Sequence, residues 1–180
     1  MPGWQSIRRG DLVPTPWRNG LGLSRNLVTE LGADGALRWQ VGIADLVHDC
    51  TFSHYPHCDR IFTPIEGDSP PMLAFHGGRY EPCPLMVPKP FPGDIPTLCR
   101  VPAPGRAFNA ITDRRYFAAT VSILHAPQPD PVAAHIVLHC LHGQLHLPGL
   151  TLHPGDSAIG PGPGPLGVDG ATILVAISRR

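Results

Sequence analysis

The stretches FPGDIP (residues 91–96) and HPGDSA (residues 153–158) share Pro-Gly-Asp, and each follows an apolar run that ends in glycine. Those runs are IFTPIEG at 61–67 and IVLHCLHG at 136–143. Proline restricts φ and glycine accepts positive φ, which suits the central positions of a type II turn, and an aspartate can accept nearby backbone N–H groups. The repetition predicts two copies of one β unit, in which both aspartates serve turns.

Proline and glycine break the rest of the sequence into short segments. The 180 residues include 23 prolines and 20 glycines, which disfavours long helices. Residues 37–43 (LRWQVGI) alternate between two faces with the period of a half-buried strand. Other apolar segments are bounded by glycine, proline or aspartate: residues 72–75, 98–101, 116–124, 136–141 and 172–177. We therefore expect an all-β protein.

The order of strand, glycine turn, hairpin and Pro-Gly-Asp is similar to the cupin barrel. Two copies predict a bicupin, in which two cupin-like β-barrels of the jelly-roll type pack into one compact unit over residues 1–180. We expect a first lobe at about 46–120 and a second at about 121–180; strands from residues 1–45 would complete the second, since a very short segment rarely forms a barrel alone. The GPGPGP run at 160–165 is interpreted as a rigid surface connection.

Charge and hydropathy disfavour two classes of partner. The 14 basic and 14 acidic side chains form no run of like charge, so neither nucleic acid nor a membrane surface is expected to bind. The N-terminal residues lack the apolar segment of a signal peptide, and no apolar stretch is long enough to span a bilayer. We expect a soluble cytoplasmic protein, and homo-oligomer formation stays open. An odd number of cysteines without a C-x-x-C pair favours free thiols: Cys50, Cys58, Cys83, Cys99 and Cys140.

Five stretches together resemble the HutD/Ves family, a bacterial family of bicupin proteins. They are TPWRNGLGLSRNLVTE (15–30), LRWQVGIADL (37–46), FSHYPHCDRIFTPIEGD (52–68), PFPGDIP (90–96) and RAFNAITDR (106–114). The most specific elements are PWRNG, the pair Asp59-Arg60 followed by Glu66-Gly67, and FPGD. The resemblance implies a protein associated with histidine utilisation that binds a small pathway metabolite and restrains the pathway instead of catalysing a step in it.

The chain departs from the family pattern at several positions. The family commonly has lysine in place of Arg18, glycine in place of Leu21 and threonine in place of Ser24. It also has Asp-Leu-Asn where this chain has Ala-Phe-Asn at 107–109, so a carboxylate is missing near Asn109.

A metal-dependent cupin enzyme, an oxygenase or isomerase, is the main alternative, because the chain has ten histidines and imidazole is a common metal ligand. The usual cupin ligand pattern is similar to H-x-H followed by a glutamate. In the stretch shortly before Gly67 that would carry the ligands, the chain has only His54 and His57, with no glutamate in the ligand position, and no histidine follows Asp156. We therefore expect no metal, no cofactor and no catalytic residues. Other histidines, such as His146 and His153, are expected to be polar residues on the outward face of a strand.

The candidate ligand-binding residues offer groups that recognise a small acid. Arginine presents a planar fork that suits a carboxylate, and asparagine amides both donate and accept hydrogen bonds. The candidates are Asn19, Arg25, His54, Asp59, Arg60, Glu66 and Asn109. The expected ligand is a carboxylate-bearing metabolite of histidine breakdown such as urocanate or formylglutamate.

Purely structural roles stay open for several candidates. Asn19-Gly20 is a common turn pair, Asp59 and Arg60 can form salt bridges with other residues, and Glu66 can cap a turn. A third hypothesis is a protein-interaction module whose barrels are filled by side chains.

Overall fold

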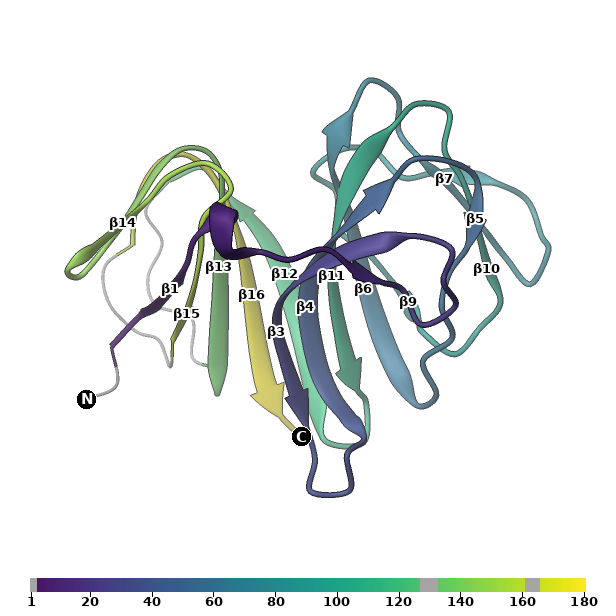
Figure 1. Cartoon of the computed structure of the whole chain (residues 1–180), viewed down its shortest axis with the longest axis horizontal. Coiled ribbons are helices and arrows are strands. Elements are labelled where there is room, and N and C mark those ends of the chain that lie inside the picture. Colours follow the sequence, from purple (N-terminus) through teal and green to yellow (C-terminus); the bar gives the residue numbers. More distant parts are fainter. Residues whose placement is uncertain (1–2, 127–132, 161–165) are drawn as a thin grey trace. The chain divides into compact units, whose positions relative to one another are not determined.

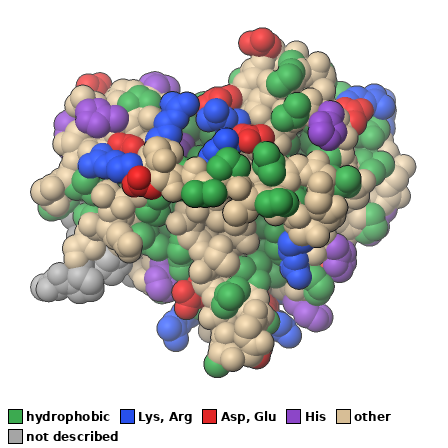
Figure 2. All heavy atoms as spheres, viewed as in Figure 1, with side chains coloured by type: hydrophobic (Ala, Val, Ile, Leu, Met, Phe, Trp, Pro, Cys, Tyr) green, Lys and Arg blue, Asp and Glu red, His purple; other side chains and the backbone are tan. Residues whose placement is uncertain are grey.

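The computed structural model describes residues 3–126, 133–160 and 166–180, so most of the GPGPGP run lies outside the described residues. The described residues form sixteen strands and one 3₁₀ helix, η1 (Arg9–Asp11), which confirms the all-β prediction. Within these ranges, no helix has the length and apolar character needed to cross a membrane. Figure 2 shows acidic and basic side chains close together on the face in view, in keeping with the net charge of zero.

The chain divides into two units. The 13–116 unit is one continuous segment, whereas the two-segment unit combines residues 1–12 with 117–180. The prediction that strands from residues 1–45 complete the second lobe is wrong for residues 13–45. Those residues pair inside the 13–116 unit because the long strand at 37–46 finds its partner at 105–113. Only Gln5–Ile7 joins the sheet of the two-segment unit.

The 13–116 unit contains two sheets (Figure 1). The larger has the order β2-β3-β4-β11-β6-β9, and the smaller has the order β5-β10-β7-β8. The larger sheet's strands are β2 (Thr15–Pro16), β3 (Leu23–Leu31), β4 (Leu37–Leu46), β11 (Gly105–Asp113), β6 (Cys58–Gly67) and β9 (Lys89–Pro92). The smaller sheet's strands are β5 (Cys50–Thr51), β10 (Thr97–Arg100), β7 (Met72–Phe75) and β8 (Glu81–Pro82).

The core of the 13–116 unit joins its two sheets. Phe62 on β6, Leu73 on β7, Cys99 on β10 and Ala107 on β11 belong to one buried cluster, together with Phe52 from the segment after β5. Phe52 packs its ring on Phe62 with the ring centroids 5.3 Å apart. This apolar cluster therefore holds the two sheets of the unit together.

The two-segment unit is a single sheet with the order β1-β15-β13-β16-β12, in which β14 pairs with β13 (Figure 1). Its strands are β1 (Gln5–Ile7), β12 (Phe117–Leu124), β13 (His135–Leu147), β14 (Leu150–Leu152), β15 (Ser157–Gly160) and β16 (Gly167–Arg179). Leucines fill its core, among them Leu138, Leu145 and Leu152. As alternation predicts, His146 and His153 are exposed beside the buried Leu145 and Leu152.

The second Pro-Gly-Asp forms the predicted turn. Gly155 has a φ of 91°, and the Asp156 N–H donates to the carbonyl of His153 at 2.9 Å. The Asp156 carboxylate accepts hydrogen bonds from the backbone N–H of Arg9 at 3.0 Å and from the Arg8 guanidinium at 2.8 Å. Asp156 therefore fastens the N-terminal segment to the turn.

The first Pro-Gly-Asp differs, and the type II turn is wrong there. Gly93 does not have a positive φ. Its N–H donates to the carbonyl of Cys58 at 2.7 Å, and its own carbonyl accepts from the N–H of Tyr55 at 2.9 Å. Gly93 therefore continues the pairing of β9 with the start of β6 and with the residues just before it, and Asp94 holds those preceding residues by its side chain.

Replacing Asp156 with alanine is expected to lower the free energy of unfolding by about 1 kcal/mol, because the Arg9 N–H and the Arg8 guanidinium lose their acceptor. Urea denaturation measures the change. Asp169→Ala, an exposed aspartate of β16, is the matched control and should leave the transition in place. Equal midpoints for Asp156→Ala and the unmodified protein would contradict this role.

Candidate functional site

The 13–116 unit contains a cavity with two adjoining parts. The inner part has a volume of about 30 Å³ and is lined by Arg60, Asn109 and Ser53, among others. The outer part has a volume of about 470 Å³ and is lined by Arg18, His57 and Arg115, among others. Both parts share five lining residues: Trp17, Ser24, Asn26, Gln40 and Tyr55. We call the whole space the cavity, with an inner end and an outer end.

Strand alternation brings the inner residues together. In the register of the larger sheet, Asn109 on β11 lies opposite Gly42 on β4, and Gly42 lies opposite Asn26 on β3. The absence of a side chain at Gly42 makes room for Asn26, since a Cβ at residue 42 would lie 2.9 Å from the Asn26 Oδ1. Arg60 on β6 lies opposite Ile111 on β11, two residues beyond Asn109. Four strands thus direct polar groups into one space.

Arg60 is the central group of the inner end, and only 7% of its surface is exposed. Its guanidinium carbon lies 4.1 Å from the centre of the Phe52 ring, and its Nε donates to the Asn109 Oδ1 at 2.9 Å. Burial lowers the pKa of Arg60 to about 10, so the side chain remains a cation at neutral pH. No carboxylate of the described residues forms an ion pair with it, which leaves a buried positive charge without a counter-ion.

Two hydroxyl side chains accompany Arg60. The Ser53 Oγ is buried and has no hydrogen-bond partner in the described structure, although the residue lines the inner end. An unpaired buried hydroxyl costs about 1–3 kcal/mol, so a bound group that pairs with it would recover that energy. Tyr55 is also buried, and desolvation raises the pKa of its phenol, although the nearby charges of Arg60 and Arg18 oppose that rise. The hydroxyls therefore add hydrogen-bonding groups beside the cation.

Amide side chains line the junction of the two ends. The Gln40 Nε2 donates to the Asn26 Oδ1 at 2.6 Å, and the Asn26 Nδ2 donates to the Thr15 Oγ1 at 3.4 Å. The two amides hold one another in place and present polar atoms to the space. The junction therefore suits a polar part of a small molecule.

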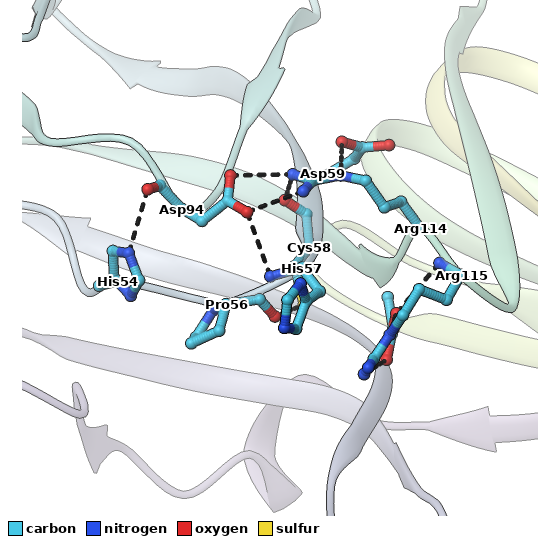
Figure 3. A network of polar contacts seen from close by, with 9 residues as sticks. His54, Pro56, His57, Cys58, Asp59, Asp94, Arg114 and Arg115 are labelled. Carbon is cyan, nitrogen blue, oxygen red and sulfur yellow. Dashed lines mark hydrogen bonds and ion pairs between the residues drawn. The ribbon is translucent and has the colours of Figure 1, made fainter.

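A charged network holds the segment that supplies Ser53 and Tyr55 (Figure 3). The Arg114 guanidinium binds both Asp94 oxygens, at 2.7 and 3.0 Å, and the Asp59 Oδ1 at 2.8 Å. It also donates to the carbonyl of Cys58. The Asp94 Oδ2 accepts from the His57 N–H at 3.2 Å. Arg114 thereby fastens the 53–58 segment, and its hydrogen bonds lower the pKa of Asp94 to about 2.

Arg60 and Asn109 are the two predicted site residues that line the cavity, and a direct hydrogen bond joins them. Asn19 instead belongs to a turn, where its Nδ2 donates to the carbonyl of Thr51 at 2.8 Å and its Oδ1 accepts from the Leu21 N–H at 3.1 Å. Gly20 has a φ of 72°, as the turn alternative predicts.

Arg25 and Glu66 do not line the cavity. Arg25 lies between Ser24 and Asn26, so alternation turns it to the opposite face of β3, where it pairs with Asp45 at 2.7 Å. Glu66 is exposed, and its carboxylate lies 3.5 Å from the Arg106 Nε.

Asp59 and His54 also lie away from the cavity lining, in the network of Figure 3. Asp59 pairs with Arg114, and the His54 Nε2 lies 3.0 Å from the carbonyl oxygen of Asp94. Their place is structural: both help to hold the segment that carries Ser53 and Tyr55.

Sequence reasoning missed several lining residues, notably Ser53, Tyr55, Asn26 and Gln40. Alternation along LSRNLVTE places Ser24 and Asn26 on one face, which is a signal that could have found them. Ser53 and Tyr55 follow no such period, because they precede β6 in an irregular segment. Across the described ranges, no three His, Cys, Asp or Glu side chains gather into a group that could hold a metal ion.

Comparisons with known proteins give the same fold. HutD from Pseudomonas fluorescens SBW25, solved in a formate condition, matches with a TM-score of 0.88 and 23% identity over 98% of this chain and 99% of that one. A conserved protein of unknown function from Pseudomonas aeruginosa PAO1 matches with a TM-score of 0.84 and 22% identity over 98% and 100%. A cupin 2 conserved barrel domain protein from Leptotrichia buccalis matches at 0.61 with 8% identity over 100% and 98%.

These likenesses show an all-β fold with cupin-like neighbours. None of the curated proteins matches the sequence. A family model described as HutD matches residues 9–174, which is most of the chain. The resemblance predicted from the motifs is thus confirmed, and the chain belongs to the HutD family.

Proposed function

We propose that this chain binds a small carboxylate-bearing metabolite in the cavity and serves as a regulatory binding protein in histidine utilisation. The observation that carries the proposal is Arg60, a buried cation without a carboxylate partner in the described structure, which lines the inner end of the cavity together with Ser53, whose hydroxyl is unpaired. A carboxylate would neutralise the charge and accept hydrogen bonds from both side chains. The regulatory role rests on what family membership implies.

The lining favours an anion over a metal cation. A cation placed beside the Arg60 guanidinium would meet a like charge in a poorly solvated space, whereas an anion would be attracted. The neighbouring groups are amides and hydroxyls from Asn109, Ser53, Tyr55 and Gln40, all of which can donate hydrogen bonds. Binding that does not rely on a metal is therefore part of the proposal.

We also propose that the two units are the two cupin-like barrels of a bicupin. Both Pro-Gly-Asp aspartates accept a backbone N–H and an arginine side chain, Asp94 from His57 and Arg114, and Asp156 from Arg9 and Arg8. Both apolar runs end in a glycine with positive φ. The leucine core of the two-segment unit supports a structural role for that unit, and the cavity supports a binding role for the 13–116 unit.

A thermal-shift screen of EDTA-treated protein tests the binding proposal. A ligand that binds the folded state alone raises its apparent stability. The panel contains formate, urocanate, formylglutamate, glutamate and histidine; formate is included because the Pseudomonas fluorescens HutD structure was solved in a formate condition. A rise with at least one carboxylate, without added metal, supports the proposal. No rise with any compound, but one on adding a transition metal, would favour the metal-dependent cupin.

Ser53→Ala should separate binding from stability. Because the Ser53 Oγ has no partner in the described structure, its removal should leave the free energy of unfolding unchanged or raise it by about 1 kcal/mol. The affinity for the carboxylate found in the screen should fall by about tenfold, the equivalent of one hydrogen bond to a charged group. Denaturant titration and calorimetry measure the two effects. Ser178→Ala, at an exposed serine of β16, is the control and should change neither the free energy of unfolding nor the affinity. An unchanged affinity in Ser53→Ala would remove Ser53 from the site.

A further inference from the structure

We infer that the ligand is a dicarboxylate that spans the cavity, with one carboxylate on Arg60 at the inner end and the second on Arg18 at the outer end. The inference rests on the proposed function, because it takes the Arg60 end as the first anion site. Among the expected ligands it selects one with two carboxylates, as formylglutamate has, over one with a single carboxylate, and it adds a residue that was not among the predicted site residues.

Arg18 has the properties of a second anion site. It lines the outer end, and its guanidinium carbon lies 5.2 Å from the centre of the Tyr55 ring. No acidic side chain of the described residues forms an ion pair with it, whereas Arg115, which lines the same end, is paired with Asp113 at 2.7 Å. Of these two arginines at the outer end, Arg18 is the one with its charge available to a ligand.

Tyr55 connects the two cationic ends. It lines both parts of the cavity, and the charges of Arg60 and Arg18 both act on its phenol. Tyr55 thus borders both the part of the cavity that Arg60 lines and the part that Arg18 lines. A dicarboxylate lying along Tyr55 would therefore place one carboxylate at each end of the cavity.

The space between the two ends suits the middle of such a molecule. Trp17 offers an apolar wall, while Asn26 and Gln40 offer polar atoms. The outer volume of about 470 Å³ lies in the range of ordinary small-molecule sites. Two separated single arginines favour two separate carboxylates, because a phosphate group usually collects several donors at one point.

The test compares straight-chain diacids with their monoamides, which keep the shape and lose one charge. Succinate, glutarate and adipate are titrated calorimetrically against succinamate, glutaramate and adipamate at low ionic strength. At least one diacid should bind about three- to tenfold more tightly than its monoamide, the magnitude of an exposed charge pair. The preference should shrink at high ionic strength, since Arg18 is exposed.

Variants of the two arginines test which residue causes the preference for the diacid over its monoamide. Arg18→Gln should lower the affinity for the diacid to that for the monoamide, whereas Arg60→Met should remove binding of both. Arg100→Gln is the matched control, because Arg100 is exposed and also stacks on a tyrosine, 4.2 Å from the Tyr80 ring centre, away from the cavity lining. The Arg100→Gln variant should keep the preference for the diacid over its monoamide.

The outcomes distinguish this inference from the proposed function. Equal binding of diacid and monoamide that still depends on Arg60 would overturn the dicarboxylate and leave the proposed function standing. A preference that survives in Arg18→Gln would overturn the assignment to Arg18. No binding of any diacid would overturn the inference, while a thermal shift with formate, urocanate or histidine, each of which has one carboxylate, would leave the proposed function standing.

Discussion

Replacing Arg60 with methionine is expected to abolish carboxylate binding and leave the protein folded. Truncating one partner of a buried charge pair costs about 2–5 kcal/mol, which corresponds to a loss of affinity of about thirtyfold to several thousandfold. Isothermal titration calorimetry with the carboxylate found in the screen measures the loss. Arg100→Met, which removes an exposed arginine outside the cavity lining, should bind as the unmodified protein does.

The same variant should change the free energy of unfolding by less than about 1 kcal/mol, because two effects oppose one another. Methionine removes the cost of burying a cation that has no carboxylate partner in the described structure, but it also removes the hydrogen bond to Asn109. Urea denaturation in the absence of ligand reports the balance. An unchanged affinity in Arg60→Met would remove Arg60 from the site. An unfolded Arg60→Met variant would show that Arg60 is structural. In that case Asn109→Asp, which places a carboxylate beside Arg60, should block ligand binding in a folded protein.

Asp94→Asn is expected to destabilise the protein by about 1–2 kcal/mol at neutral pH and to have little effect near pH 2. Hydrogen bonds from Arg114 lower the pKa of Asp94 from its ordinary value of 3.8 to about 2. A lowered carboxyl pKa means that the folded state favours the ionised form. The stabilisation is therefore fully present above the ordinary value and is lost as the pH falls toward 2. The lower value of about 1 kcal/mol allows for solvent screening of the Asp94 carboxylate, which is partly exposed.

Urea denaturation at a series of pH values between neutral and acid measures this prediction. The curve of the unmodified protein should fall more steeply than that of Asp94→Asn through the acid range, and the two should converge at the acid end. Asp68→Asn, at an exposed aspartate of the same unit, is the control and should follow the unmodified curve. Parallel curves for Asp94→Asn and the unmodified protein would contradict the role of the Arg114 network. Weaker ligand binding in Asp94→Asn would further indicate that the network positions Ser53 and Tyr55.

The candidate site was only partly predictable from the sequence. Arg60 and Asn109 were separate candidates from the family motifs, and they come together because the register of β6 and β11 aligns their faces. Arg25 was misplaced because a single position decides the face of a strand, and its neighbours Ser24 and Asn26 point into the cavity instead. Asn19 was ambiguous, because an asparagine before a glycine serves a turn as readily as a ligand.

What the sequence determined by itself depends on local preferences. Frequent proline and glycine, the alternation at 37–43 and the turn at Pro154-Gly155 are decided by neighbouring residues, so the all-β fold and the second Pro-Gly-Asp turn were predictable. Long-range pairing decided the rest. Pairing of β4 with β11 placed residues 13–45 in the 13–116 unit, and Arg114 fixed a segment more than 50 positions earlier. Such contacts depend on which strands meet, and many pairings satisfy the same local pattern.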